Sequence, residues 1–142
     1  QPLLSERRIP LSEERRTRWQ GILHEAVEQS ERLWKPELLN SITLREWLSK
    51  RSSNSAFALA TTRMKSGMDI HDWIGDLSDD ISQIGVAIGP EGGWTSKEEM
   101  LTDEFSCMKV QLGQSILRTS TAAVVVSEVM ASYRRLTCNN PI

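Results

Sequence analysis

Apolar residues recur along the chain with two different periods, and these periods predict where helices and strands lie. From Trp19 to Val27 an apolar side chain returns every three or four positions, which is typical of a helix with one buried face. Ser12 stands before this run as an N-cap, and Pro36 stands after it. The pattern therefore predicts an amphipathic helix over residues 13–34.

Short apolar runs bounded by turn residues predict the strands of a sheet. Residues 56–62 and 84–88 are apolar on both faces, as in parallel strands that are covered by helices on two sides. We expect residues 84–88 to form a central strand. Residues 108–112 alternate with period two, which predicts a strand with one face less covered. Residues 1–10 are interpreted as the end of a strand and the loop that leaves it.

Capping residues predict two further helices. Either Ser41 or Thr43 can begin a short helix within residues 41–50, where the apolar residues again have helical spacing. Thr95 and Glu98 have the spacing of a capping box, in which each side chain accepts a backbone hydrogen bond from the other residue. A helix is therefore expected directly after Thr95.

In the C-terminal segment, side-chain propensity and segment length favour different structures. Three consecutive valines at positions 124–126 favour a strand, because β-branched residues lose rotamer freedom in a helix. The segment is too long for one strand and starts with hydroxyl residues that can cap a helix. We therefore expect a helix over residues 120–136, buried against the sheet or another subunit. The acidic stretch around Trp73 is expected to be a solvated connection with a helical turn.

Composition and charge limit the class of protein. The chain has 142 residues, 39% of them hydrophobic and 25% charged, which suits one globular domain. Its alternating strands and helices predict an α/β fold with a parallel sheet and flanking helices. No apolar run approaches the roughly 20 residues of a membrane span. The net charge of −2 argues against a broadly basic nucleic-acid binder but leaves a local basic face open.

The two cysteines and the first residue add two expectations. Cys107 and Cys138 lie far apart, with no CxxC pair and no histidine at ligand spacing, so the usual zinc patterns are excluded. Incidental thiols of this kind are typical of a reduced, intracellular protein. The chain begins with Gln1 rather than Met, so we expect it to be a piece of a longer protein.

Two loops carry the candidate chemistry. Gly-Pro-Glu-Gly-Gly at residues 89–93 follows one predicted strand, and residues 112–118 follow another. Both loops would lie at the carboxyl edge of a parallel sheet, where α/β proteins bind ligands. The first loop is neither a GxGxxG dinucleotide motif nor a P-loop, and as an isolated turn its glycines need no ligand. The second adds an apolar wall at Leu117 and a fixed cation at Arg118, which together suit a flat apolar ring with a polar tail.

The two loops together resemble a known family. IGPEGGWTSKE at residues 88–98 and VQLGQSILRTSTAA at residues 110–123 are similar to the RsmE family of S-adenosylmethionine-dependent methyltransferases. PLLSERR at residues 2–8 and RWQGILHEAVEQSER at residues 18–32 resemble the upstream segments of the same family. Members methylate N3 of a uridine in small-subunit ribosomal RNA and belong to the SPOUT superfamily. The resemblance therefore covers nearly the whole chain.

The resemblance implies a fold, partners and a location. It implies a parallel sheet with flanking helices, a C-terminal trefoil knot and a homodimer. The cofactor would be S-adenosylmethionine without a metal, and the partner would be small-subunit ribosomal RNA rather than DNA or a membrane. The location would be the cytoplasm, or an organellar matrix or stroma in a eukaryote. The family's N-terminal PUA-like domain and the first strand-helix unit of its methyltransferase domain are not found in the sequence.

The resemblance also assigns roles to individual residues. Arg118 would stabilise charge that develops on the uracil carbonyl, and Glu91 would act as a base or an orienting group. Glu91 can equally be a residue that caps the next helix or fixes its loop. RNA would be held by Arg7, Arg8, Arg118 and Thr119. The cofactor would be held, chiefly through backbone groups, by Leu59, Gly89, Pro90, Gly92, Gly93, Leu112, Gly113, Ile116 and Leu117.

One substitution departs from the family motif, and two other functions are compatible with the sequence. The family motif LRTETA reads LRTSTA here, so Ser120 stands where a glutamate is usual. Loss of that carboxylate either frees Arg118 to meet phosphate or the uracil oxygen, or weakens its positioning. The alternatives to an enzyme of this family are a non-catalytic knotted module that binds S-adenosylmethionine and RNA as a dimer, and an unrelated nucleotide-binding α/β enzyme.

Overall fold

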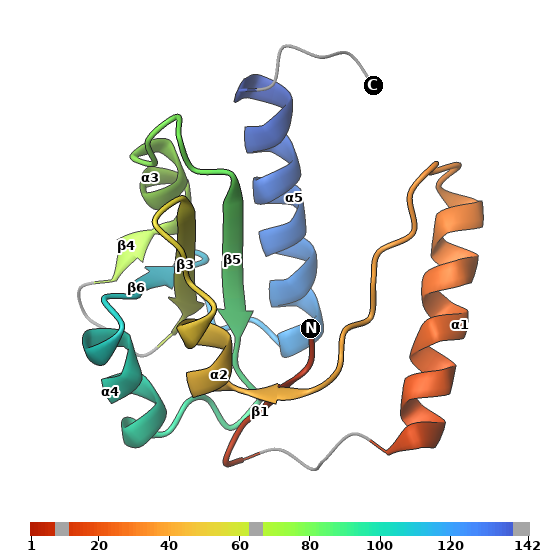
Figure 1. Ribbon diagram of the computed structural model, residues 1–142, viewed down its shortest axis with the longest axis horizontal. Coiled ribbons are helices and arrows are strands. Elements are labelled where there is room, and N and C mark those ends of the chain that lie inside the picture. The colour runs from red at the N-terminus through yellow and green to blue at the C-terminus, as the bar shows by residue number, and fades with distance from the viewer. Residues whose placement is uncertain (8–11, 63–66, 138–142) are drawn as a thin grey trace.

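Parallel strands form the centre of the molecule (Figure 1). The computed structural model describes residues 1–7, 12–62 and 67–137. A four-stranded sheet has the order β4-β6-β3-β5, and β1 pairs separately with β2; both sheets are parallel. The predicted α/β fold with a parallel sheet is thus confirmed. The strand bounds are β1 Leu3–Leu4, β2 Ile42–Thr43, β3 Ser55–Ala60, β4 Met68–Asp69, β5 Gln83–Ile88 and β6 Met108–Gln111.

The sheet register puts β3, not β5, in the interior. β3 pairs with β5 from Ser55↔Gln83 to Ala60↔Ile88 and with β6 on its other side. All six residues of β3 are buried. Within the described ranges β5 pairs with β3 alone, so the expectation that residues 84–88 form a central strand is wrong. β5 is apolar because both of its faces are covered by packed side chains. The sequence pattern shows whether the faces of a strand are covered, but not whether a second strand pairs with its edge.

The described residues contain five helices, four of which begin at a side-chain cap. Ser12, Thr43, Asp69 and Thr95 each accept a hydrogen bond from a backbone N–H in the first turn that follows. Helices expected within residues 41–50, after Thr95 and over residues 120–136 are confirmed. Within the described ranges, no helix is long and apolar enough to cross a membrane. The bounds are α1 Glu13–Gln29, α2 Leu44–Ser49, α3 Ile70–Gly75, α4 Ser96–Glu104 and α5 Thr119–Thr137.

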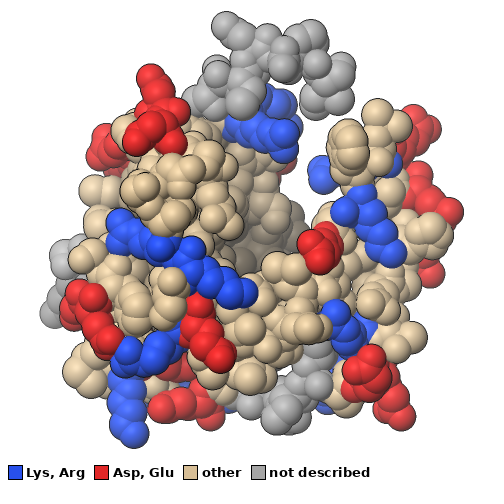
Figure 2. Space-filling view, in the orientation of Figure 1, with Lys and Arg blue, Asp and Glu red and all other residues tan. Residues whose placement is uncertain are grey.

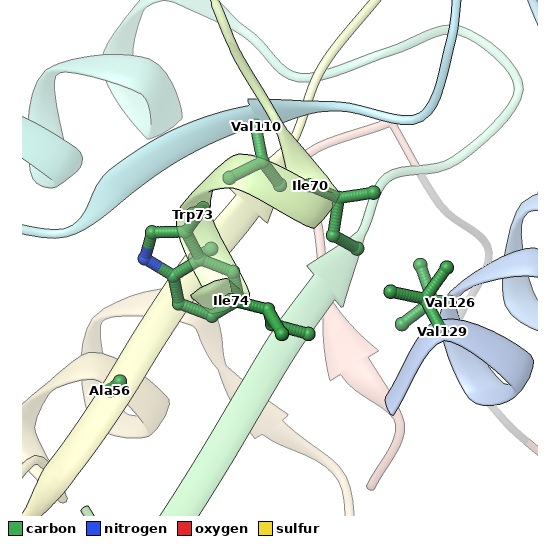
Figure 3. Close-up of a cluster of buried hydrophobic side chains, with 8 residues drawn as sticks. Ala56, Ile70, Trp73, Ile74, Val110, Val126 and Val129 are labelled. Atoms are coloured by element: carbon green, nitrogen blue, oxygen red, sulfur yellow. The ribbon is translucent and has the colours of Figure 1, made fainter. Parts of the chain in front are cut away.

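Hydrophobic clusters cover both faces of the sheet. On one face α3 and α5 meet β3 and β6, as Figure 3 shows. The other face packs against α2 and the segment around Trp94. Alternate residues of β3 supply both clusters, Ala56 and Ala58 to the first and Phe57 and Leu59 to the second.

The segment around Trp73 is a core element rather than a solvated connection. It forms α3, and its side chains Ile70, Trp73 and Ile74 are only 1%, 5% and 4% exposed. The acidic residues of this segment mask the apolar spacing, because they occupy the outward positions of a single short helix. The expectation of a solvated connection is therefore wrong, although the expected helical turn is present.

Helix α1 is shorter and less covered than its sequence predicts. It ends at Gln29 rather than near residue 34, and Glu31 then takes a left-handed backbone conformation with φ of 51°. None of its residues is buried, and α1 stands at one side of the molecule (Figure 1). Arg16 ties it to the following segment through the backbone oxygens of Leu38 and Leu39, at 2.9 and 3.2 Å.

The buried thiol of Cys107 should make the stability of the protein depend on pH. This thiol is buried and donates to the Phe57 carbonyl at 3.2 Å, and this burial raises the pKa of Cys107 to about 11. The folded protein therefore favours the protonated thiol. The free energy of unfolding keeps its full value while Cys107 is protonated in both states, below the thiol's pKa of about 9.0 in the unfolded chain. It falls as pH rises from there to the thiol's pKa in the folded protein.

We expect the parent protein to lose stability more steeply than Cys107→Ala between about pH 9 and 11, by on the order of 2 kcal/mol. Urea unfolding of both proteins at several pH values measures the difference. Parallel stability curves would contradict the raised pKa.

Candidate functional site

The two candidate loops meet at the carboxyl edge of the sheet. The glycine loop, residues 89–93, leaves β5, and the second loop, residues 112–118, leaves β6. β5 and β6 lie on either side of β3 and run parallel, so both loops emerge at the same edge. The Thr119 hydroxyl at the start of α5 donates to the Gly89 carbonyl at 3.1 Å. This bond joins the glycine loop to the end of the second loop.

Hydrogen bonds to its carbonyl oxygens fix the shape of the glycine loop. The Gly93 N–H donates to the Pro90 carbonyl at 2.8 Å, and Gly93 has φ of 70°, which disfavours a side chain. Arg7 donates from Nη1 to the Gly92 carbonyl at 2.5 Å. The carbonyls of Gly89, Pro90 and Gly92 are therefore each held by a different part of the chain.

Trp94 supports the glycine loop from below. Its side chain is 7% exposed, and its indole N–H donates to the Ala60 carbonyl at the end of β3, at 3.0 Å. A Cβ added at Gly89 would lie only 3.0 Å from the indole ring, so Gly89 must lack a side chain for the loop to rest there. Sequence reasoning did not select Trp94. The signal for it was a large aromatic residue directly after the glycine loop, at the carboxyl edge of the predicted sheet.

A cavity of about 100 Å³ lies between the two loops. Its apolar wall includes Ile88, Leu112, Ile116 and Leu117, and Ile116 is 77% exposed at the open side. Of the expected cofactor residues, those that line it are Gly89, Pro90, Gly93, Leu112, Ile116 and Leu117. Residues that sequence reasoning missed also line it, namely Ala60, Thr61, Thr62, Ile88, Trp94, Glu99, Ser115 and Ala122.

Three expected cofactor residues are not part of this wall. Leu59 is 0% exposed within the core cluster beneath Trp94, so its side chain supports the site and is not available to a ligand. Gly113 is exposed with φ of 122°, which allows the second loop to turn. Gly92 faces the side of the loop where Arg7 lies.

The residues expected to act on RNA are spread around the cavity. Glu91 lines the cavity and is exposed. Arg118 is exposed immediately before α5, outside the cavity wall. Thr119 uses its hydroxyl to join the loops, and Arg7 binds the glycine loop. The expectation for Arg8 lies outside the described residues. Ser120, the residue that replaces the family glutamate, is exposed in the first turn of α5.

A larger groove, of about 820 Å³, follows the outer edge of β5. It lies between β5, the N-terminal segment and one side of α5, and it reaches Arg15 on α1. Figure 2 shows the surface hollowed between α1 and the rest of the molecule. The groove shares the glycine loop with the smaller cavity, but the second loop does not line it. The smaller cavity is therefore the better candidate for the ligand that both loops hold.

Charge is unevenly divided between the two hollows. Among the described residues lining the small cavity, the charged ones are Glu91 and Glu99. The groove contains Arg7 and Arg15 as well as Glu91. On the visible face, basic and acidic side chains are interspersed, without one broad basic surface (Figure 2). A polyanion would therefore meet local basic positions on this face rather than a uniform field.

Comparison with known proteins agrees with this arrangement. The model of the RNA methyltransferase domain family matches residues 1–131. The chain is 39% identical over 127 residues to ribosomal RNA small subunit methyltransferase E of Synechocystis, covering 88% of this chain and 41% of the relative. It is 38% identical over 101 residues to the protein of the same name from Rickettsia conorii, covering 70% of this chain and 40% of that one.

Solved structures resemble the fold over nearly the whole chain. A ribosomal RNA small subunit methyltransferase E from Neisseria gonorrhoeae, bound to S-adenosyl methionine, has a TM-score of 0.76 and 35% identity, covering 96% of this chain and 54% of that one. A putative methyltransferase from Legionella pneumophila, in complex with the same cofactor, has a TM-score of 0.76 and 26% identity, covering 92% and 54%. The chain thus spans about half the length of these relatives. The family match and the resemblance of its two loops agree, and the chain belongs to the RNA methyltransferase domain family, of the RsmE type.

Proposed function

We propose that this chain is the catalytic portion of an S-adenosylmethionine-dependent methyltransferase that acts on N3 of a uridine in small-subunit ribosomal RNA. The observation that carries the proposal is the Thr119–Gly89 hydrogen bond, which joins the two loops around an apolar-walled cavity. The name and bound cofactor of the relative from Neisseria gonorrhoeae support the same function.

The residues of the cavity suit part of S-adenosylmethionine. Leu112, Ile116 and Leu117 offer an apolar wall for a flat ring, and the glycine loop brings its backbone close to a ligand. The cavity of about 100 Å³ is smaller than the roughly 300–1,000 Å³ usual for a ligand pocket. It therefore encloses one ring of the cofactor, while the remainder extends through the open side beside Ile116, or the second loop moves outward on binding.

The reaction needs charge stabilisation and removal of a proton, with the cofactor supplying the methyl group. The exposed guanidinium of Arg118, immediately before α5, stabilises negative charge on a uracil carbonyl. Glu91, at the rim, accepts the N3 proton or orients the base. Holding base and methyl donor in line supplies a further part of the acceleration. Thr119 contributes by fixing the glycine loop.

The complete protein would contain further structural units. The outer edge of β5 has no strand partner among the residues that the structure describes, and this edge and the groove beside it suit the first strand-helix unit that the family resemblance implies. The PUA-like domain that precedes it in the family would supply additional RNA contacts. A longer protein that includes these units is expected to show slower hydrogen exchange along β5 than the 142-residue chain. Equal exchange rates would argue against a strand in this groove.

The resemblance also supports a trefoil knot at the C-terminal end of the domain and a homodimer in the compartment where ribosomes are assembled, the cytoplasm or an organelle. Two exposed apolar residues near the second loop, Ile116 at 77% and Val124 at 69%, would be covered by the second copy. Sedimentation analysis of the parent and of Val124→Glu tests this surface. A parent that stays monomeric at high concentration would contradict the dimer.

Calorimetry followed by a methyl-transfer assay tests the function. Titration with S-adenosylmethionine and, separately, with ATP distinguishes this family from an unrelated nucleotide-binding enzyme, since we expect binding of the first ligand only. Transfer of labelled methyl groups to unmethylated small-subunit RNA then distinguishes an enzyme from a non-catalytic module. Because the groove beside β5 is open, both the chain and its extended form are assayed. Binding without transfer in both forms would favour the non-catalytic module.

A further inference from the structure

We infer that Arg7 is a positioning residue that holds the cofactor loop, rather than a residue that contacts RNA. The family resemblance led us to expect that Arg7 holds RNA, because it is a basic residue in a segment that resembles the family. The inference rests on the proposed function, since it takes the cavity between the loops as the site of S-adenosylmethionine. It adds a residue, Arg7, that does not line the cavity but holds the loop that forms part of the cavity wall.

The side chain of Arg7 contacts the glycine loop directly. Nη1 donates to the Gly92 carbonyl across 85 positions of sequence. The aliphatic part of the same side chain covers Gly92, since a Cβ added there would lie 3.3 Å from Arg7 Cδ. One residue thus both bonds to the loop and packs against it. The hydrogen bond and this packing hold the Arg7 guanidinium in one direction. A side chain that binds RNA phosphate does not need to be held against its own protein in this way.

Glu6, the residue before Arg7, is hydrogen-bonded to Glu98 in the first turn of α4, a few residues after the glycine loop. The Glu6 N–H donates to Glu98 Oε1 at 3.1 Å, and Glu98 Oε2 accepts the Thr95 N–H at 2.8 Å. Glu98 is only 6% exposed, so this carboxylate is a built-in acceptor for both backbone groups. Consecutive residues of the N-terminal segment therefore hold the glycine loop at Gly92 and the first turn of α4 at Glu98.

The attachment at Gly92 bears on the cavity because the glycine loop, residues 89–93, forms part of its wall. Gly89, Pro90, Glu91 and Gly93 all line it. Without Arg7, the Gly92 carbonyl loses its charged donor, and the loop samples more conformations before a ligand binds. The cofactor must then order the loop itself, which weakens its binding. For one such hydrogen bond at an exposed position we expect about a three- to tenfold rise in Kd.

The test compares Arg7→Ala with Arg7→Lys and with Arg15→Ala. Arg15 is the matched control because it is an exposed arginine lining the same groove. We expect Arg7→Ala to raise the Kd and KM for S-adenosylmethionine about three- to tenfold, with kcat at saturating cofactor retained. Arg7→Lys should recover part of the affinity, because an ammonium can still donate to the Gly92 carbonyl. Affinity for RNA should change no more than in Arg15→Ala.

Two results would overturn the inference. One is weaker RNA binding by Arg7→Ala at an unchanged Kd for the cofactor, and the other is no change in either affinity. If the parent itself binds no S-adenosylmethionine, the proposed function fails instead. Hydrogen exchange of the Gly93 amide, which bonds to Pro90 in the folded loop, still tests Arg7 in that case. Arg7→Ala should accelerate this exchange and Arg15→Ala should not, and equal rates in both variants would refute the inference.

Discussion

An Arg118→Ala variant is expected to bind S-adenosylmethionine with nearly parental affinity and to transfer methyl groups about 10²–10³-fold more slowly. The first expectation follows because Arg118 is exposed and does not line the cavity between the loops. The second follows because a charge that develops on the uracil carbonyl in the transition state loses its cation. Single-turnover kinetics at saturating cofactor measures the rate separately from binding.

Arg134→Ala is the control for this variant. Arg134 is an exposed arginine on the last turns of the same helix, so its removal changes net charge by the same amount at a distance from both loops. We expect its methyl-transfer rate to remain near that of the parent. An Arg118→Ala protein that retained the parental rate would remove Arg118 from the proposed mechanism.

A Trp94→Ala variant is expected to lose about 3–5 kcal/mol of unfolding free energy, the usual cost of truncating a buried large aromatic side chain. Trp94 is 7% exposed, and its indole N–H satisfies the Ala60 carbonyl. Its removal leaves a cavity beneath Gly89 and an acceptor without its donor. Urea unfolding followed by circular dichroism measures the loss.

Trp34→Ala provides the same chemical change at the surface. Trp34 is 83% exposed, so we expect its substitution to alter the unfolding free energy by no more than about 0.5 kcal/mol. Trp94→Phe separates the two contributions at the buried site, since it keeps most of the ring but removes the donor, at a cost of about 1–3 kcal/mol. Equal stability of the Trp94→Ala and Trp34→Ala proteins would show that Trp94 does not support the fold.

Local signals predicted much of the fold. The predicted capping box of Thr95 with Glu98 forms with both reciprocal hydrogen bonds, and Thr43, one of the two caps expected for α2, forms a second box with Glu46, because such caps depend on residues only three positions apart. Segment length correctly outweighed the β-branched valines of α5. Pairing between distant strands was less accessible, since the apolar pattern of β5 is the same at the edge of a sheet as at its centre.

The site was predictable as two loops but not as a set of side-chain directions. Glycine and an apolar run mark the loops in the sequence, and six of the expected cofactor residues line the cavity. The direction of the Leu59 side chain was not predicted, because the alternation of β3 turns it into the core, where Phe57 also lies. The hydrogen bonds that Arg7 and Thr119 donate to the glycine loop were missed for another reason. Their partners, Gly92 and Gly89, are backbone carbonyls 85 and 30 positions away.

These long-range bonds to the glycine loop affect how the protein folds. The loop is held by Arg7 in the N-terminal segment and by the Thr119 hydroxyl at the start of α5, so we expect it to take its final shape only after both segments have docked. Contacts between residues far apart in sequence carry a larger entropy cost of loop closure than local contacts do. Ligand affinity at this site is therefore a sensitive measure of complete folding, and a bound ligand in turn protects both ends of the chain from local unfolding.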